Sequence, residues 1–296
     1  MIDISIFQLE ALKPRSVEAV ASSEVYRFIV GPEKKEYYIH SAVLANHSPA
    51  LDAMVNGGLQ ESGDRIVDWT DVDSSAFLGL WQFLYSGRYA APVLISRLDE
   101  DLLETEIREE EAGTLPDSTL PGCTLPGCKM PGCTMPECIP TGLWLEFETL
   151  RLADSEDSAS PQPKSVGRRV VMNSYADLLL QHARVCVLAD KFMIPLLKQL
   201  ALTALRKELR IHFYDPKKIP EIAPDAIALL QYCFNNPAPE KLRTLVSLFA
   251  ACIITDLWKC EGFQDLLESS REFSTAISGC IGTNLDGILL KRLLDN

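Results

Sequence analysis

The sequence has no long hydrophobic run and no basic, apolar leader at its start. Its longest apolar stretch, residues 245–254, is far shorter than the roughly 20 residues that a membrane-spanning helix needs. The first residues carry Asp3 and Glu10 instead of a basic start followed by an apolar run, so we expect neither a membrane span nor a secretory signal. We therefore predict an intracellular protein, cytoplasmic or nuclear, whose nine cysteines are reduced thiols.

Positive charge is also scarce. The chain of 296 residues has 41 acidic and 28 basic residues, which gives a net charge of −13. Over half of this charge lies in residues 99–111, which hold eight acidic residues and Arg108 as their one basic residue. Proteins that bind nucleic acid use clustered Lys and Arg against phosphates, so we expect no nucleic-acid partner and no membrane partner.

Catalytic motifs are missing too. The sequence contains no G-x-S-x-G, no H-E-x-x-H, no Gly-rich phosphate loop and no dinucleotide fingerprint. His182 and Cys186 lie one turn apart on a predicted helix and could form a Cys/His nucleophile pair. Cys186 falls on the apolar face, however, where cysteine usually acts as a small hydrophobic residue. We therefore predict a protein that is not an enzyme, with no catalytic residue and no cofactor.

What the chain does contain begins with a strand pattern. Residues 25–30 (VYRFIV) alternate between two faces and are rich in β-branched and aromatic side chains. Gly31-Pro32 and three charged residues then turn the chain into a second strand over residues 36–39, which predicts a β-hairpin. Residues 64–69 predict a third strand.

Helical patterns surround the third strand. An apolar stripe runs from Val43 to Val55, but Ser48-Pro49 interrupts it, which predicts two short helices. A further helix is expected to begin at a cap at Asp73 or Ser74 and to end at Gly87. We expect its buried face to carry Phe77, Leu80, Trp81, Leu84 and Tyr85. His40, between strand and helix, is expected to be buried and bonded to the backbone.

The order of these elements, a strand hairpin, two short helices, a strand and a longer helix, resembles that of the BTB/POZ domain family, in particular its filamentous-fungal members. The motif positions that carry the resemblance, most of them expected to be structural, are His40, Leu44, Ser48, Pro49, Tyr85 and Gly87. Residues 175–209 are similar to the helical pair that completes the domain. Ser41 replaces the basic residue that often follows the histidine of the family, which argues against a dimer pocket that depends on a charge there. The resemblance implies an α+β fold in which a small sheet packs on a helical cluster.

The resemblance implies a role in binding other proteins. One form of this role is self-association through the first helices and an exchanged or added strand. Another is docking of a cullin scaffold, which would make the chain a substrate adaptor of a cullin-RING ubiquitin ligase. An adaptor would need a second domain that binds the substrate. The sequence shows no kelch repeat, zinc-finger pair or MATH-like β-sandwich that could serve as one, so self-association is our first prediction. Further alternatives are a structural or scaffolding protein that only oligomerises and a degenerate paralogue without a partner.

Residues 91–173 have the composition of an acidic, low-complexity insertion. Residues 114–138 consist of a five-residue repeat. Because every repeat contains a proline, we predict a loop. The repeat places four cysteines at equal intervals, at Cys123, Cys128, Cys133 and Cys138. They leave open a structural zinc site, although paired C-x-x-C spacing is missing. A β-solenoid would need a longer tract. A docking segment that orders on binding and replicated sequence without function complete the alternatives.

The insertion separates two predicted parts of the domain, and further helices are expected after it. An apolar group after the repeats is expected to anchor back on the domain: Leu143, Trp144, Leu145, Phe147 and Leu150. Beyond it we expect helices over residues 225–234 and 240–258, and one or two over 262–294 around a break at 279–287. The predicted segments are an N-terminal segment 1–23, a first BTB/POZ-like part 24–90, a disordered insertion 91–173, a second part 174–210 and a C-terminal helical extension 211–296.

Overall fold

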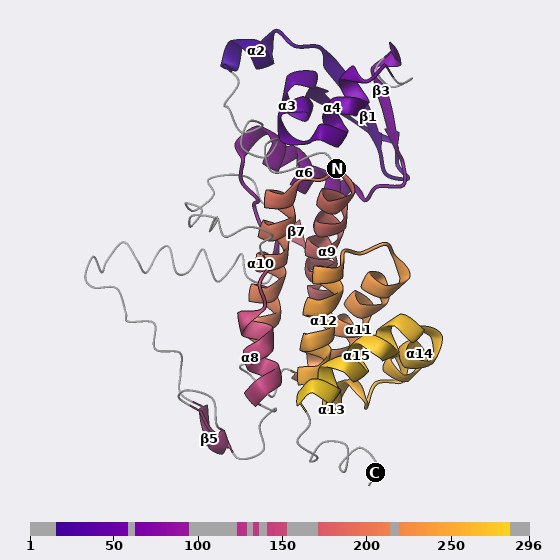
Figure 1. The fold of residues 1–296 in the computed structure, drawn as a ribbon. Helices are drawn as coiled ribbons and strands as arrows, with labels where there is room; N and C mark the ends of the chain where they lie inside the picture. The colour runs from indigo at the N-terminus through magenta and orange to yellow at the C-terminus, as the bar shows by residue number, and fades with distance from the viewer. Residues whose placement is uncertain are drawn as a thin grey trace, which may run out of the picture. The chain divides into compact units, whose positions relative to one another are not determined.

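A computed structural model of the chain describes residues 16–58, 63–94, 123–128, 133–135, 141–152, 171–213 and 219–284. The chain forms two compact units (Figure 1). The first contains Met1–Pro92, Ala153–Val171 and Leu180–Leu205, and the second contains Val93–Leu152, Met172–Leu179 and Arg206–Asn296. The structure is mostly helical and contains a small sheet, which confirms the predicted α+β fold class.

The first unit contains a three-stranded sheet of β1 (Val25–Val30), β2 (Lys35–His40) and β3 (Ile66–Trp69) in the order β2-β1-β3. β1 and β2 are antiparallel, which confirms the predicted hairpin, whereas β1 and β3 are parallel. The hairpin turns at Gly31, whose φ of 72° favours glycine. The register places Arg27 opposite both Tyr38 and Ile66.

One face of this sheet is the core of the first unit. Tyr26, Phe28 and Val30 on β1 are at most 1% exposed, which confirms the predicted alternation. The ring of Phe28 contacts Trp69 at 5.0 Å and Phe77 at 5.6 Å between centroids. Since such edge-to-face and tilted pairs add to the hydrophobic gain from burial, these aromatic contacts hold the sheet against the helix that follows it.

Four helices pack with the sheet in the first unit: α2 (Val17–Ala21), α3 (Ser41–His47), α4 (Pro49–Asn56) and α6 (Ser74–Ser86). The predicted division between α3 and α4 is confirmed, because Pro49 is the first residue of α4. Asp73 caps α6, with Oδ1 accepting hydrogen bonds of 3.0 Å from the amides of Ser75 and Ala76. Gly87 ends α6 in the left-handed conformation, also as predicted.

Two long helices from the later sequence, α9 (Tyr175–Lys191) and α10 (Pro195–Phe213), contribute residues 180–205 to the first unit. Gln181 Nε2 donates a 2.7 Å hydrogen bond to the carbonyl of Ser75. The ring of Phe192 stacks on Trp69 with centroids 4.5 Å apart, and its carbonyl accepts a hydrogen bond from the Ser48 hydroxyl. Residues far apart in the sequence therefore share one core, although the unit boundaries fall inside α9 and α10.

The connection from α9 to α10 contains an uncommon backbone conformation. Met193 has a φ of 52°, and the amide of Ile194 reaches back to the carbonyl of Ala189 at 2.8 Å. The amide of Met193 itself bonds the carbonyl of Asp190 at 3.0 Å. These bonds form a Schellman motif, in which glycine usually occupies the left-handed position. Methionine here carries a steric cost that glycine would not.

Replacing Met193 by Gly is expected to raise the free energy of unfolding of the first unit by about 1 kcal/mol, because the left-handed strain disappears. The side chain is 56% exposed, so little packing is lost. Urea denaturation followed by Trp fluorescence measures the change. Met54→Gly inside α4 is the control, and it should destabilise the unit by a similar amount. Destabilisation by Met193→Gly would contradict the strain argument.

The second unit contains mainly helices: α8 (Thr141–Thr149), α11 (Ile219–Asn235), α12 (Glu240–Cys252), α13 (Ile254–Leu257), α14 (Glu261–Ser269) and α15 (Arg271–Asn284). The short strand β4 (Val93–Leu94) also belongs to this unit, and β7 (Val171–Met172) lies at the boundary between the two units. The core of the unit is aromatic in part, since the ring of Phe273 lies 5.0 Å from Phe234 and 5.8 Å from Phe263.

Three predicted boundaries in the second unit are wrong. α11 begins at Ile219, before the predicted start, and contains Pro224. The helix predicted over 240–258 is interrupted at Ile253, between α12 and α13. A break lies instead at Ser270, and α15 continues through Gly279 to Asn284, while the rest of the break predicted at 279–287 lies outside the described residues. Glycine lowers helix stability by only about 1 kcal/mol, which the burial of Phe273 and Ile277 on α15 offsets.

The insertion has more regular structure than predicted. β5 (Cys123–Cys128) and β6 (Cys133–Met135) pair in parallel, so the expectation of a loop is wrong over these residues. α8 buries Leu143, Trp144 and Phe147 and packs against α12 in the second unit. Most of the apolar group after the repeats is thus anchored on the C-terminal helices, whereas Leu145 is 61% exposed. Arg206 of α10 also donates hydrogen bonds to the carbonyls of Glu148 and Leu150. Much of the predicted disorder in 91–173 falls outside the described residues.

Candidate interaction site

His40 and Tyr85 form the first contact among the predicted motif positions. The hydroxyl of Tyr85 accepts a 3.1 Å hydrogen bond from the backbone amide of His40 and lies 2.9 Å from His40 Nδ1. With its own hydrogen directed at Nδ1, the hydroxyl satisfies both groups. The pair joins the end of β2 to the last turn of α6, so these two motif positions hold the sheet and the helix together.

Two expectations about this pair are wrong. His40 is only partly buried, and its described partner is a side chain instead of the backbone. Tyr85 was predicted in the core, but 40% of it is exposed. Its ring lies against Trp81 at 4.8 Å, and Trp81 is also only partly buried. The apolar stripe of α6 is therefore wider than the face that the core covers, which leaves an aromatic edge at the surface.

Leu44, Ser48 and Pro49 lie where α3 meets α4. Leu44 has no exposed surface. The hydroxyl of Ser48 accepts hydrogen bonds from the amides of Ala50 and Leu51 at 3.1 and 3.2 Å, which makes Ser48 the cap of α4. Pro49 fits the first helical position because its missing amide hydrogen would have no partner there. The geometry at these three positions serves packing and helix capping.

His47 is a site residue that the sequence analysis did not select. Its Nε2 lies 2.8 Å from the carbonyl of Leu84, so the nitrogen donates to the C-terminal end of α6. Burial lowers the pKa of His47 below its ordinary value, and the hydrogen bond to Leu84 opposes this shift only in part. His47 is therefore neutral at pH 7. The signal in the sequence was its place at the end of α3, one turn beyond Val43.

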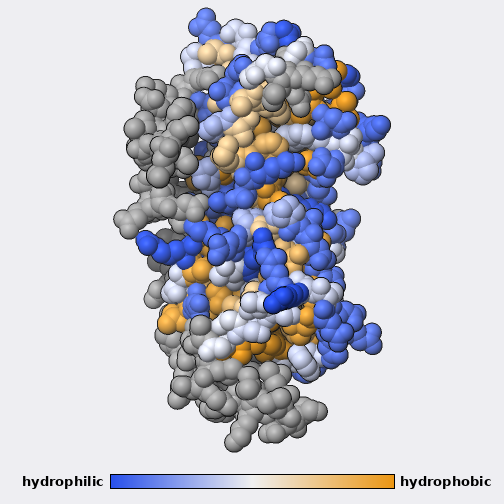
Figure 2. All heavy atoms as spheres, turned by 45° about the vertical axis from the view of Figure 1, so that its right-hand side comes forward, coloured by the Kyte–Doolittle hydropathy of each residue, from blue (hydrophilic) through white to orange (hydrophobic). Residues whose placement is uncertain are grey.

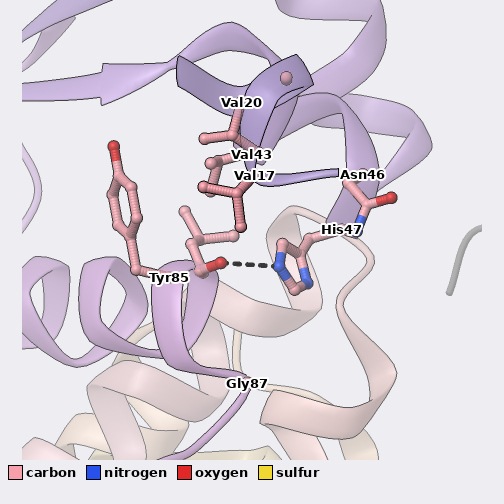
Figure 3. Close-up of a pocket in the computed structure, with 9 residues that line it drawn as sticks. Val17, Val20, Val43, Asn46, His47, Tyr85 and Gly87 are labelled. Carbon is pink, nitrogen blue, oxygen red and sulfur yellow. Dashed lines mark hydrogen bonds between the residues drawn. The ribbon is translucent and has the colours of Figure 1, made fainter. Parts of the chain in front are cut away.

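A pocket of about 400 Å³ opens beside His47 (Figure 3). Its lining comes from α2, α3 and the end of α6: Val17, Val20, Ala42, Val43, Asn46, His47, Leu84, Tyr85 and Gly87. Val17, Val20 and Val43 lie close together in Figure 3, near the His47 ring. The pocket has apolar walls and a histidine edge, a composition that suits an apolar side chain of a protein partner. We call this lining the α2–α3 surface.

The proposed Cys/His pair has a different environment. His182 and Cys186 have no exposed surface, and His182 Nδ1 lies 2.8 Å from the hydroxyl of Tyr89. Burial raises the pKa of the Cys186 thiol to about 12 and lowers that of His182 to about 3. A buried thiol with so high a pKa supplies almost no thiolate for attack. The structure thus places both residues in the core of the first unit.

The described residues contain no group of three or more His, Cys, Asp or Glu side chains arranged to hold a metal ion. The cysteine side chains of the repeat, which carried the zinc alternative, lie outside the described residues. None of the helices described for residues 16–284 is long and apolar enough to cross a membrane.

The comparison with protein families agrees with the motif positions. The family model described as the BTB/POZ domain matches residues 27–106. This stretch is a BTB/POZ domain. BTB/POZ domains are generally modules for protein–protein interaction. The match begins in β1 and does not extend to residues 175–209, and the filamentous-fungal type of the domain stays a prediction. No curated protein matches the chain.

Proposed function

We propose that the BTB/POZ domain of this protein self-associates and that the α2–α3 surface forms the contact between two copies. This function rests most on one observation, the apolar pocket bordered by a short helix with an exposed valine. Val17 is 86% exposed although it is aliphatic. Its place next to a recess on the same surface makes that surface suitable for contact with its own copy.

The instability of α2 on its own supports this contact. The helix has five residues, all of them at least partly exposed, and isolated helices this short are not stable in water. Its described cap is the Ser16 hydroxyl, which accepts a 3.1 Å hydrogen bond from the amide of Ala19. A partner that covers Val17 and Val20 would remove apolar surface from water, at about 25 cal/mol per Å².

Two-fold symmetry suits this surface. In an isologous dimer the same patch meets itself, so each copy must offer both a projection and a recess. α2 supplies the projection through Val17, and the pocket beside His47 supplies the recess. Because His47 is neutral at pH 7, no buried charge opposes the insertion of an apolar side chain. The charged residue within α2 itself is Glu18.

The full-length double variant Val17→Asp, Val20→Asp is expected to be monomeric where the unchanged chain is dimeric, because two carboxylates would have to be buried in the contact. We expect the dimer dissociation constant to rise at least tenfold, about 1.4 kcal/mol. Size-exclusion chromatography with light scattering over a concentration series measures the mass. Val25→Asp is the matched control, since Val25 is 42% exposed on β1 and lies outside the α2–α3 surface.

Two results of the mass measurement would contradict the proposal. A monomeric mass for the unchanged chain up to tens of micromolar would reject the proposal, and equal dimerisation of the double variant would reject the surface. The cullin-adaptor alternative is tested on the same preparations by a pull-down with purified cullin, where no binding at micromolar concentration rejects it. We place the protein in the cytoplasm or nucleus, where free thiols at Cys186, Cys233, Cys252, Cys260 and Cys280 would stay reduced.

A further inference from the structure

The face of the sheet that points away from the core has an unusual composition. Along β1, β2 and β3, the residues that alternate with buried ones include Val25, Arg27, Ile29, Tyr38, Ile66 and Asp68. The register places them next to one another, with Arg27 between Tyr38 and Ile66, and Ile29 opposite Asp68. We call this set, together with Glu36 opposite Ile29, the outer sheet face.

A sheet that is buried on one side normally carries polar side chains on the other. Here the apolar residues are well exposed: Tyr38 by 56%, Val25 by 42% and Ile66 by 36%. Figure 2 turns this part of the molecule toward the viewer and shows hydrophobic residues at the surface among hydrophilic ones. Because the three residues lie on three neighbouring strands, the exposed apolar area is continuous around Arg27 and is not a scatter of single residues.

Two of the charged side chains on this face pair with each other, and the third does not. Arg27 Nη1 lies 3.0 Å from Glu36 Oε1, and the hydroxyl of Tyr38 donates a 3.0 Å hydrogen bond to the other oxygen of Glu36. These two charges therefore neutralise each other. Asp68 forms no ion pair within 4 Å among the described residues, although the more distant charge of Lys34 also acts on it. Hydrogen bonds from Thr70 hold its pKa below the ordinary value, so Asp68 is ionised.

The outer sheet face therefore offers a paired arginine and a tyrosine between aliphatic side chains, with an exposed carboxylate that forms no close ion pair at one edge. Tyrosine and arginine are the residue types that often dominate binding energy at protein interfaces. Three strands span two spacings of about 4.8 Å, which together match the roughly 10 Å diameter of a helix with its side chains. The dimensions fit one helix laid on the sheet.

We propose that the outer sheet face docks a helix of another protein, and that this helix presents Leu or Ile side chains next to Lys or Arg. The aliphatic residues cover Val25, Tyr38 and Ile66. The basic residue pairs with Asp68, since Arg27 is paired with Glu36 and the residues of the face then carry a net charge of −1. This contact is separate from the α2–α3 surface, so the chain could hold a helical ligand while it is also self-associated.

A phage-displayed library of helical peptides of about 20 residues tests the proposal on the full-length chain. One face of each peptide is randomised over Leu, Ile, Lys, Arg, Asp and Glu. Enriched sequences are expected to combine aliphatic with basic residues, because the carboxylate of Asp68 selects a positive charge. In fluorescence anisotropy, Asp68→Lys and Tyr38→Ala should each weaken binding of an enriched peptide at least tenfold. Higher salt should weaken binding to the unchanged chain.

Val17→Asp is the matched control, because it alters an exposed valine outside the outer sheet face and should leave peptide affinity unchanged. No enrichment, enrichment of acidic peptides, or equal binding to Asp68→Lys would overturn the proposal. A change of oligomeric mass in Tyr38→Ala would also overturn it, since a second copy would then cover the face. Loss of self-association in Val17→Asp with peptide binding intact separates failure of this proposal from failure of the proposed function.

Discussion

Replacing Phe147 by Ala is expected to lower the free energy of unfolding of the second unit by about 3–5 kcal/mol. The ring has no exposed surface, stacks on Trp144 at 5.0 Å and lies 5.9 Å from Phe249 of α12. Its removal would leave a cavity between α8 and α12, which the surrounding helices can fill only in part. A domain is stable by only about 5–15 kcal/mol, so this loss is a large share.

Hydrogen exchange of the full-length chain measures this effect where it occurs. Amides of α12 should exchange faster in Phe147→Ala, in proportion to the lost free energy. Leu145→Ala is the matched control on the same helix, because Leu145 is 61% exposed and its truncation should change stability by less than about 0.5 kcal/mol. Equal protection of α12 in both variants would mean that α8 contributes nothing to the core of this unit.

Acid is expected to destabilise the first unit through His182. The folded state lowers the pKa of this histidine from 6.5 to about 3, because the buried ring loses its solvation when it is charged. Between these two values the unfolded chain binds a proton that the folded chain does not. Stability is therefore complete above pH 6.5 and falls as the pH drops towards 3. The full loss from this one group is roughly 4–5 kcal/mol.

His182→Gln isolates this contribution, since glutamine is polar but does not titrate. Urea denaturation at pH values from 7 to 4 gives the free energy of unfolding for both proteins. The dependence on pH should be steeper in the unchanged chain, by up to about 1.4 kcal/mol per pH unit. Parallel curves for the two proteins would show that His182 takes up its proton equally in the folded and unfolded states, against the burial described above.

The elements that the sequence predicted well have strong local signals. Proline is favoured in the first turn of a helix, where Pro49 lies, and Asp73 and Gly87 mark the two ends of α6, so these boundaries follow from the residues themselves. The hairpin of β1 and β2 follows from alternation and the Gly31 turn. Local chemistry decides these features, and the remainder of the chain changes them little.

The wrong predictions depend on contacts distant in the sequence. A helix was predicted to begin at residue 225, but α11 begins earlier because its first turns bury Ile219, Ile222 and Ala223. Tyr85 lies on the apolar stripe of α6, but its hydroxyl bonds His40 and its ring stays partly exposed. The parallel pairing of β1 with β3 joins residues with two helices between them, which no local pattern specifies.

The candidate site was predicted only in part. The motif positions were identified, and they serve mainly to hold α3, α4, α6 and the sheet in place. The pocket residues Val17 and His47 were missed because they come together only after α2 folds onto α3. The outer sheet face was readable as the exposed half of an alternating pattern. Its importance depends on the register, which brings Tyr38 and Ile66 to either side of Arg27.

The hydrogen bond from Ser48 to Phe192 spans 144 positions of sequence, and it has a consequence for synthesis on the ribosome. While the chain is translated, the sheet and its first helices emerge long before Phe192. During this time the ring of Trp69 has no Phe192 ring to stack on. At about 5–20 residues per second, this interval lasts of the order of ten seconds. Throughout it, the nascent chain exposes apolar surface that the completed fold buries.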